Sequence, residues 1–160
     1  MMRPLAAIVL IASMLCAGCT FERAWDAAGV APEGGVAGQW EGIWKSDKSR
    51  SHGGLRCAIR QISPDTCEAY FHATHGVVFA LNQQVNMRVW RADGDWQFSG
   101  SEDLGVMNGG LFEYNGHLHG DRFTATYRSP VDFGTFILTR VHGDVVSPPA
   151  TRAATAPASH

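Results

Sequence analysis

The sequence predicts an all-β fold in which eight antiparallel strands form an up-and-down meander and close into a small barrel. Runs of alternating apolar and polar residues recur about every ten residues, with turn signals between them, as in an all-β sandwich or barrel. Glycine supplies 18 of the 160 residues and aromatic residues 10%, and sustained helical periodicity is scarce. Each run has one apolar and one polar face, which suits a sheet closed on itself because closure leaves no exposed edge strand.

The turn signals divide the chain into strands and set their directions. The stretch "SPDT" at residues 63–66 places proline in a turn, and "ADGD" at residues 92–95 is an Asp-Gly hairpin signal. Links this short cannot hold a parallel crossover, so sequence neighbours should pair antiparallel. The expected strands cover residues 39–46, 54–63, 67–75, 77–91, 95–103, 110–118, 122–128 and 132–141.

The N-terminal stretch "MMRPLAAIVLIASMLCAGC" predicts an export signal at residues 1–18. Arg3 precedes an apolar run that is shorter than the roughly 20 residues of a membrane-spanning helix. The final Cys-Ala-Gly-Cys resembles a bacterial lipobox, which implies that Cys19 is lipidated and becomes the mature N-terminus. Thr20 in the next position resembles the outer-membrane sorting pattern of Gram-negative cells. The expected location is therefore the cell envelope, with secretion or periplasmic release and an uncleaved membrane anchor as the alternatives.

One folded domain is expected, at residues 38–142. Residues 19–37 are interpreted as the lipidated N-terminus and a tether, with room for a short helix around residues 21–28. Residues 143–160 lack apolar periodicity and contain adjacent prolines, so they are expected to be disordered. The formal net charge of −2 and the scattered basic residues do not form the basic stripe of a nucleic-acid-binding protein.

A family resemblance follows from Gly38-x-Trp40 at the start of the first strand, the eight-strand meander and Arg140 near the end of the last strand. Together these features resemble a calycin-type barrel, the group that includes lipocalins, avidins and fatty-acid-binding proteins. The resemblance implies that Trp40 closes one end of the barrel and that Arg140 lies across it. Such a cation–π contact contributes about 0.5–2 kcal/mol, so Trp40 is interpreted as structural.

A ligand pocket is predicted inside the barrel. Gln83 is the one polar residue in the otherwise apolar inward set of its strand, and an unpaired buried amide costs about 1–3 kcal/mol. Further polar residues expected to face inward are Gln61, His75 and Glu102. An apolar pocket with few polar groups is typical of a small-molecule site. Its predicted lining is Trp44, Phe71, Gln83, Phe98 and Tyr114.

The leading interpretation is a non-enzymatic, lipid-anchored barrel protein that binds a small hydrophobic or amphipathic molecule and needs no cofactor. The alternative is a filled barrel that acts as a structural or protein-interaction lipoprotein through its tail or outer face. A secreted hydrolase is the third class, although no nucleophile elbow or pair of cooperating acids is evident.

No metal site is predicted. His117 and His119 share the outward parity of their strand, and the chain offers no His-x-x-x-His or Cys-x-x-Cys spacing.

The cysteines of the domain, Cys57 and Cys67, are expected to be unbonded. A two-residue turn at residues 64–65 would pair Cys57 with His72, five residues from Cys67. That offset is roughly 17 Å along a strand, beyond the reach of a disulfide. A bulge or a longer loop would be needed to join them.

Overall fold

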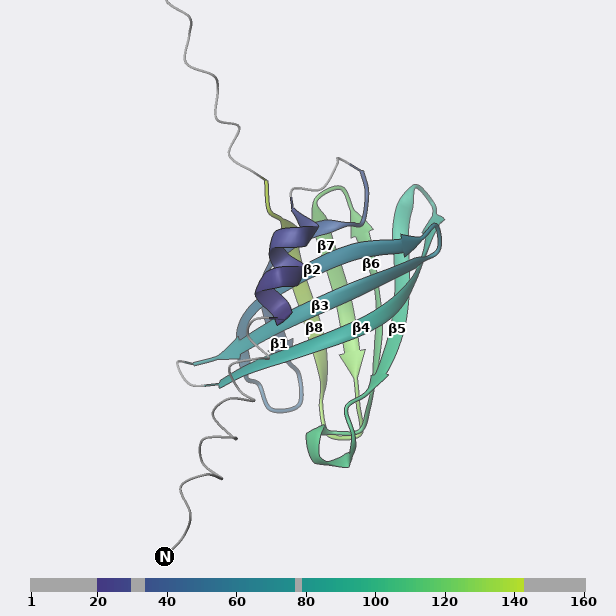
Figure 1. The fold of residues 1–160 in the computed structure, drawn as a ribbon. Coiled ribbons are helices and arrows are strands. Elements are labelled where there is room, and N and C mark those ends of the chain that lie inside the picture. Colours follow the sequence, from purple (N-terminus) through teal and green to yellow (C-terminus); the bar gives the residue numbers. More distant parts are fainter. Residues whose placement is uncertain (1–19, 30–33, 77–78, 143–160) are drawn as a thin grey trace, which may run out of the picture.

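The computed structural model describes residues 20–29, 34–76 and 79–142, and these form a closed antiparallel barrel (Figure 1). Each strand pairs with its sequence neighbours, and the last pairs with the first. The strands are β1 (Gly38–Ser46), β2 (His52–Ser63), β3 (Thr66–His75), β4 (Phe79–Ala92), β5 (Asp95–Asp103), β6 (Leu111–His119), β7 (Arg122–Arg128) and β8 (Phe133–Arg140). A short 3-10 helix, η1 (Val106–Asn108), lies in the connection between β5 and β6.

The predicted fold class is confirmed. The bounds of β5 and β7 agree with the sequence prediction, and the other strands begin and end within two residues of it. The signal at residues 1–18, the lipid attachment at Cys19 and the disordered tail at residues 143–160 lie outside the described residues. Residues 77–78, predicted as the start of the fourth strand, also lie outside them.

The inward side chains at the upper end of the barrel in Figure 1 form a packed aromatic and aliphatic core. Phe98 stacks on Phe123 with ring centroids 4.3 Å apart, and Trp40 lies 5.9 Å from Phe123. Gly116 makes this packing possible, since a Cβ at that position would lie 2.4 Å from Cζ of Phe98. The other large buried side chains of this core are Ile59, Met87, Val85 and Leu138.

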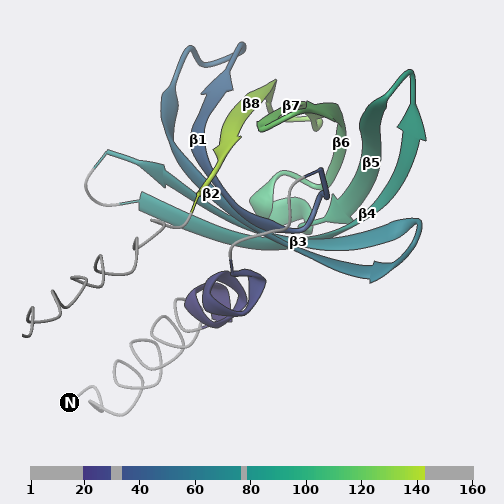
Figure 2. The ribbon, with the colours of Figure 1, turned by 90° about the horizontal axis from the view of Figure 1, so that it is seen from above.

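A helix over residues 20–28 packs on the outside of the barrel, against β2 and β3 (Figure 2). Phe21 and Trp25 are buried there with Ala58, and the Arg56 guanidinium lies 4.0 Å from the centroid of the Trp25 ring. This part of the predicted tether is therefore docked on the domain. Within the described residues, no helix has the length and apolar character needed to cross a bilayer.

The helix has a defined direction relative to the barrel. Near its start, the ring of Phe21 lies 5.0 Å from that of His72, in the middle of β3. One turn later, the carbonyl of Trp25 accepts a hydrogen bond from Nε2 of Gln39, at the beginning of β1 (2.8 Å). The helix thus runs toward the end of the barrel where β1 begins, and its first residue points toward the opposite end.

Cys57 and Cys67 are free, but the register predicted for them is wrong by one residue. The β2–β3 ladder shifts between Gln61 and Ser63, so Ile62 forms a bulge. As a result Cys57 lies opposite Phe71, and Cys67 lies opposite Gln61. The two sulfurs are therefore separated along the ladder by four residues, roughly 13 Å at the usual strand rise.

Alkaline pH is expected to destabilise the protein. Burial raises the pKa of Cys67 to about 11 and the pKa of Cys57 well above its usual value. Below the unfolded pKa of about 8.5, both thiols are protonated in the folded and in the unfolded protein, so the folded state keeps its full stability there. As the pH rises from that value toward the folded pKa, the unfolded protein loses these protons first and the stability is lost. We expect the free energy of unfolding to fall by about 1 kcal/mol per pH unit per thiol above roughly pH 9.

Urea denaturation of the wild type and of a Cys57→Ala/Cys67→Ala variant would measure this effect. The pH should run from about 8 to about 10.5, roughly from the unfolded pKa of a thiol toward the folded pKa of Cys67. The variant should show a shallower pH slope than the wild type. Equal slopes would mean that the thiols do not contribute.

Candidate functional site: a cavity at the open end of the barrel

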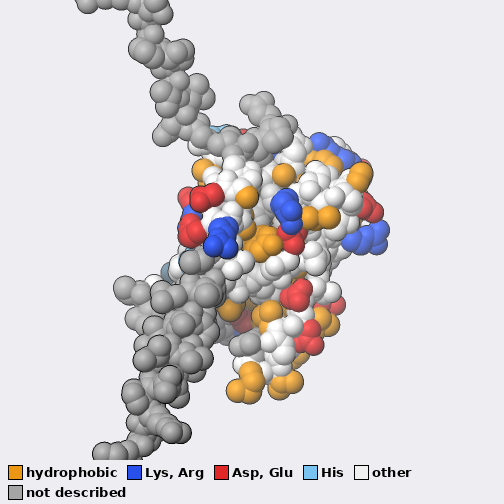
Figure 3. Space-filling model, viewed as in Figure 1, with side chains coloured by type: hydrophobic (Ala, Val, Ile, Leu, Met, Phe, Trp, Pro, Cys, Tyr) orange, Lys and Arg blue, Asp and Glu red, His pale blue; other side chains and the backbone are white. Residues whose placement is uncertain are grey.

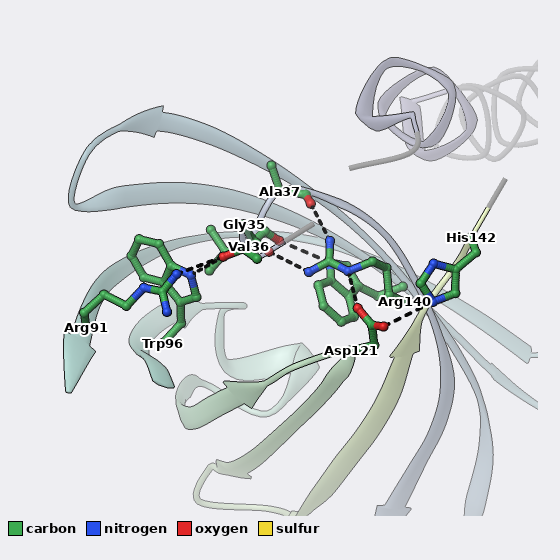
Figure 4. A network of polar contacts seen from close by, with 10 residues as sticks. Gly35, Val36, Ala37, Arg91, Trp96, Asp121, Arg140 and His142 are labelled. Atoms are coloured by element: carbon green, nitrogen blue, oxygen red, sulfur yellow. Dashed lines mark hydrogen bonds and ion pairs between the residues drawn. The ribbon is translucent and has the colours of Figure 1, made fainter. Parts of the chain in front are cut away.

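One end of the barrel is sealed by a polar network around Arg140 (Figure 4). Nη2 of Arg140 donates to the Gly35 carbonyl (2.6 Å) and Nη1 to the Ala37 carbonyl (3.2 Å), while Nε donates to Oδ1 of Asp121 (2.8 Å). The guanidinium carbon lies 4.3 Å from the centroid of the Trp40 ring. The residues expected to close the barrel, Trp40 and Arg140, are thus in contact.

The segment of residues 34–37 crosses this closed end as a strap. Nε1 of Trp40 donates to the carbonyl of Val36 (3.2 Å), and the Val36 side chain is buried in the core. On the far side of the opening, Arg91 and Trp96 donate to the carbonyl of Gly34 at 3.0 and 2.8 Å. The strap therefore lies across this end of the barrel and is bonded to β1, β4, β5 and β8.

The opposite end of the barrel, below in Figure 1, holds a cavity of about 210 Å³ that opens outward. An engineered cavity of about 150 Å³ binds benzene, whereas drug-sized sites measure about 300–1,000 Å³. The cavity therefore has the volume of a small ring or a short chain. Its lining is Trp44, Ala73, Thr74, Leu81, Gln83, Phe112, Tyr114, Tyr127, Asp132 and Phe136.

Aromatic rings form most of the cavity wall. Phe136, on β8, contacts Tyr127 and Tyr114 with ring centroids 4.9 and 6.1 Å apart. Phe112 lies 6.3 Å from both tyrosines. These contacts join β6, β7 and β8 into one rigid wall, which is a preformed surface for an apolar group.

Trp44, on β1 next to Phe136 of β8, is fixed by a hydrogen bond. Its Nε1 donates to the carbonyl of Thr74 (2.9 Å), across β2. Gly53 lies between the two, and a Cβ there would sit 1.7 Å from that carbonyl oxygen. Glycine at this position lets the indole reach its acceptor, so Trp44 presents a fixed ring face to the cavity.

Gln83 is the unusual polar group of the cavity. Its Nε2 is buried and has no hydrogen-bond partner among the described residues. Burial raises the pKa of Tyr114, and a polar contact with the Gln83 side chain, which favours the phenolate as a hydrogen-bond donor does, partly opposes this rise. The Tyr114 oxygen is thus close to the Gln83 amide, but Nε2 makes no hydrogen bond of normal geometry to it or to another described residue.

Asp132, the other strongly polar lining residue, is already engaged by the protein. Its Oδ1 accepts from Oγ of Ser46 (2.6 Å) and from the Phe133 amide (2.9 Å), and its Oδ2 accepts from the Tyr127 hydroxyl (3.0 Å). Burial raises the pKa of Tyr127, and the hydrogen bond to Asp132 raises it further. This network joins the β7–β8 turn to β1. Asp132 thus places a carboxyl group in the cavity lining, which contains no Lys or Arg.

The structure brings together three of the predicted pocket residues, Trp44, Gln83 and Tyr114. Phe71, on β3, contacts the Phe136 and Tyr114 rings (5.6 and 6.2 Å) but does not line the cavity, and Phe98 lies deeper in the closed-end core. Sequence reasoning missed the other seven lining residues, Ala73, Thr74, Leu81, Phe112, Tyr127, Asp132 and Phe136. The four large apolar and aromatic ones have inward parity, and their closeness to the open-end turns was the available signal.

The remaining polar positions do not extend the site. Gln61 is exposed near the closed end, and His75 is exposed at the mouth, where its Nδ1 lies 3.1 Å from the His52 carbonyl. His117 and His119 are exposed on β6. Among residues 20–29, 34–76 and 79–142, no three His, Cys, Asp or Glu side chains come together in a way that could hold a metal ion.

Comparisons with protein-family models, curated proteins and solved structures gave no match to this chain. The eight-stranded antiparallel barrel itself is compatible with a calycin-like fold.

Proposed function

We propose that this chain is a calycin-like barrel protein of the cell envelope, anchored through a lipid on Cys19, whose cavity binds a small apolar or amphipathic molecule. The observation that carries the proposal is the unpartnered Gln83 amide in an aromatic cavity. An unsatisfied buried donor costs about 1–3 kcal/mol. A ligand oxygen that accepts from Nε2 would offset this cost, while the rings bind the apolar part.

The charges of the cavity favour a neutral ligand. The one carboxylic acid in the lining is Asp132, and no Lys or Arg lines the cavity to pair with an anionic head group. A carboxylate placed there would lose its hydration and face a like charge. An ester, amide or hydroxyl oxygen at Gln83 avoids both penalties.

The volume favours partial enclosure of the ligand. A cavity of about 210 Å³ is below the range of drug-sized sites. A ring or the first carbons of a chain would lie inside, and the rest of a longer molecule would extend through the mouth.

Binding of matched neutral and anionic ligands tests the proposal. Decanol, methyl decanoate and decanoate share an alkyl chain, and titrations of the full-length protein would follow tryptophan fluorescence and calorimetric heat. The neutral ligands are expected to bind at least about tenfold more tightly than the carboxylate. Absence of binding by all of them, together with no small molecule in native mass spectra of protein from its own host, would overturn the proposal.

Replacement of Gln83 by methionine is expected to weaken ligand binding and stabilise the free protein. Methionine keeps the length of the side chain but removes the unpaired donor. The affinity for methyl decanoate should fall about tenfold, while the free energy of unfolding should rise by about 1 kcal/mol.

Gln84→Met is the matched control, because Gln84 lies next in β4 but faces outward and donates to Oε1 of Glu68 (2.5 Å). It should leave the affinity unchanged. If Gln83→Met binds as well as the wild type does, the amide does not contact the ligand.

A further inference from the structure

Exposed apolar residues lie at the mouth end of the barrel, on β4, around the β5–β6 connection and in the β7–β8 connection. Val106 and Met107, in η1, are both 95% exposed, and Leu111, Val131 and Leu81 are also exposed. We call these five residues the mouth rim. In Figure 3, hydrophobic side chains gather at the lower tip of the molecule, where the ribbon of Figure 1 places the β5–β6 connection. Contiguous apolar surface of this kind marks an interaction site.

The rim is held in place by its own hydrogen bonds. The Leu104 amide donates to the Gly110 carbonyl and the Gly110 amide to the Gly105 carbonyl, both at 3.0 Å. The Gly105 amide also donates to Oδ1 of Asp103 (2.8 Å). These hydrogen bonds hold the β5–β6 connection in one conformation, in which the side chains of Val106 and Met107 face solvent.

The β7–β8 turn continues the same surface. A Cβ on Gly109 would lie 2.6 Å from the Val131 side chain, so the two connections are in contact. Nζ of Lys48 donates to the Val131 carbonyl (2.8 Å) and joins the β1–β2 connection to them. Leu81 lines the cavity and is exposed, which makes the rim continuous with the cavity wall.

The N-terminal helix gives the direction of the membrane. It starts beside His72 and ends near the closed end, so its first residue faces the same side as the mouth. The chain before it contains the apolar run of residues 4–15 and Cys19. The described helix begins at residue 20, so a lipid on Cys19 would attach to the domain on the mouth side.

We infer that the mouth rim docks onto the lipid bilayer, so that the cavity opens toward the membrane. The inference rests on membrane attachment of the N-terminal segment, as proposed above, but not on a ligand in the cavity. Apolar side chains at the interface then lie in the boundary between head groups and acyl chains, as in other monotopic proteins. A ligand could pass between the bilayer and the cavity without crossing water.

Charge plays a small part in this docking. Lys48 and Arg50 in the β1–β2 connection are accompanied by Asp47, and Asp103 lies beside η1. Anionic lipids attract basic residues, but here the acids offset them. The contact is therefore expected to depend little on salt or on the fraction of anionic lipid.

Quenching by brominated lipids tests the orientation in the full-length protein. A fluorescent amino acid replaces Met107, or Ile62 as the matched control, since Ile62 is also exposed and lies at the closed end. Each protein is reconstituted into nanodiscs of phosphatidylethanolamine and phosphatidylglycerol, with plain or brominated acyl chains. Bromine should reduce the fluorescence at position 107 at least about twofold and leave position 62 unchanged.

A second pair of variants tests whether the apolar rim causes the orientation. With the probe at position 131, Val106→Asp/Met107→Asp should abolish quenching, whereas Ile62→Asp should not. Equal quenching at positions 107 and 62, or none at position 107, would overturn the inference. Because no ligand is added, failure of the ligand proposal would leave these results unchanged.

Discussion

Trp40→Ala is expected to lower the free energy of unfolding by about 3–5 kcal/mol, the usual range for removing a buried tryptophan or phenylalanine. The Trp40 side chain is completely buried, contacts the Phe123 ring and donates to the Val36 carbonyl. Its removal would leave a cavity beneath the strap and deprive that carbonyl of its donor. Urea denaturation of the full-length protein, followed by far-ultraviolet circular dichroism, would measure the loss.

Trp90→Ala is the matched control, because Trp90 lies near the same end of the barrel but is 45% exposed. It should cost less than about 1 kcal/mol. Ligand binding by Trp40→Ala, measured at a temperature where the variant remains folded, should be close to that of the wild type. Similar stability of the two variants would contradict the structural role of Trp40.

This comparison reflects a division of tasks along the barrel. The closed half holds the packed core and the strap, whereas the open half holds the cavity and its unpartnered amide. The packed core at the closed end allows a cavity with an unpartnered amide at the open end. An unsatisfied donor costs less free energy than a packed aromatic core contributes to stability.

The fold could be predicted because it depends on local signals. Parity fixes which residues face inward, and Asp93-Gly94 and Pro64 fix where strands turn. Both signals act over a few residues, so they can be recognised without knowing which strands pair. The agreement at β5 and β7 follows from the clear turns on their closed-end sides.

Positions along the barrel axis were harder to predict, because they depend on register. Phe98 and Tyr114 have the same parity, but Phe98 is the second inward residue after the closed-end turn and lies opposite Gly116, deeper in the core. Ile62 adds a bulge that no hairpin signal announces. Parity alone therefore identifies inward residues without separating core from cavity.

Contacts made by connections were missed for a different reason. Asp121 and Asp132 lie in turns, and their partners Arg140 and Ser46 are distant in sequence. The strap likewise acts through backbone carbonyls, which carry no sequence signature. Gln83 could be identified because the residues at alternate positions on either side of it, such as Leu81 and Val85, are apolar.

Arg140→Met is expected to lower the free energy of unfolding by about 2–4 kcal/mol, the cost of leaving two strap carbonyls without their charged donor. Methionine keeps the aliphatic length that packs on Trp40, so the loss would come from the guanidinium. That group is 1% exposed and bonds two strap carbonyls as well as Asp121. Without it the carbonyls of Gly35 and Ala37 lose their donor.

Arg140→Lys separates charge from geometry. An ammonium keeps the charge but cannot span both carbonyls and Asp121 while lying flat over the indole. It should recover about half of the stability lost in Arg140→Met. Hydrogen exchange at residues 34–37 gives a local readout, because detachment of the strap should speed exchange there in both variants before the barrel unfolds. Full recovery by lysine, with unchanged exchange in the strap, would show that charge alone holds this end closed.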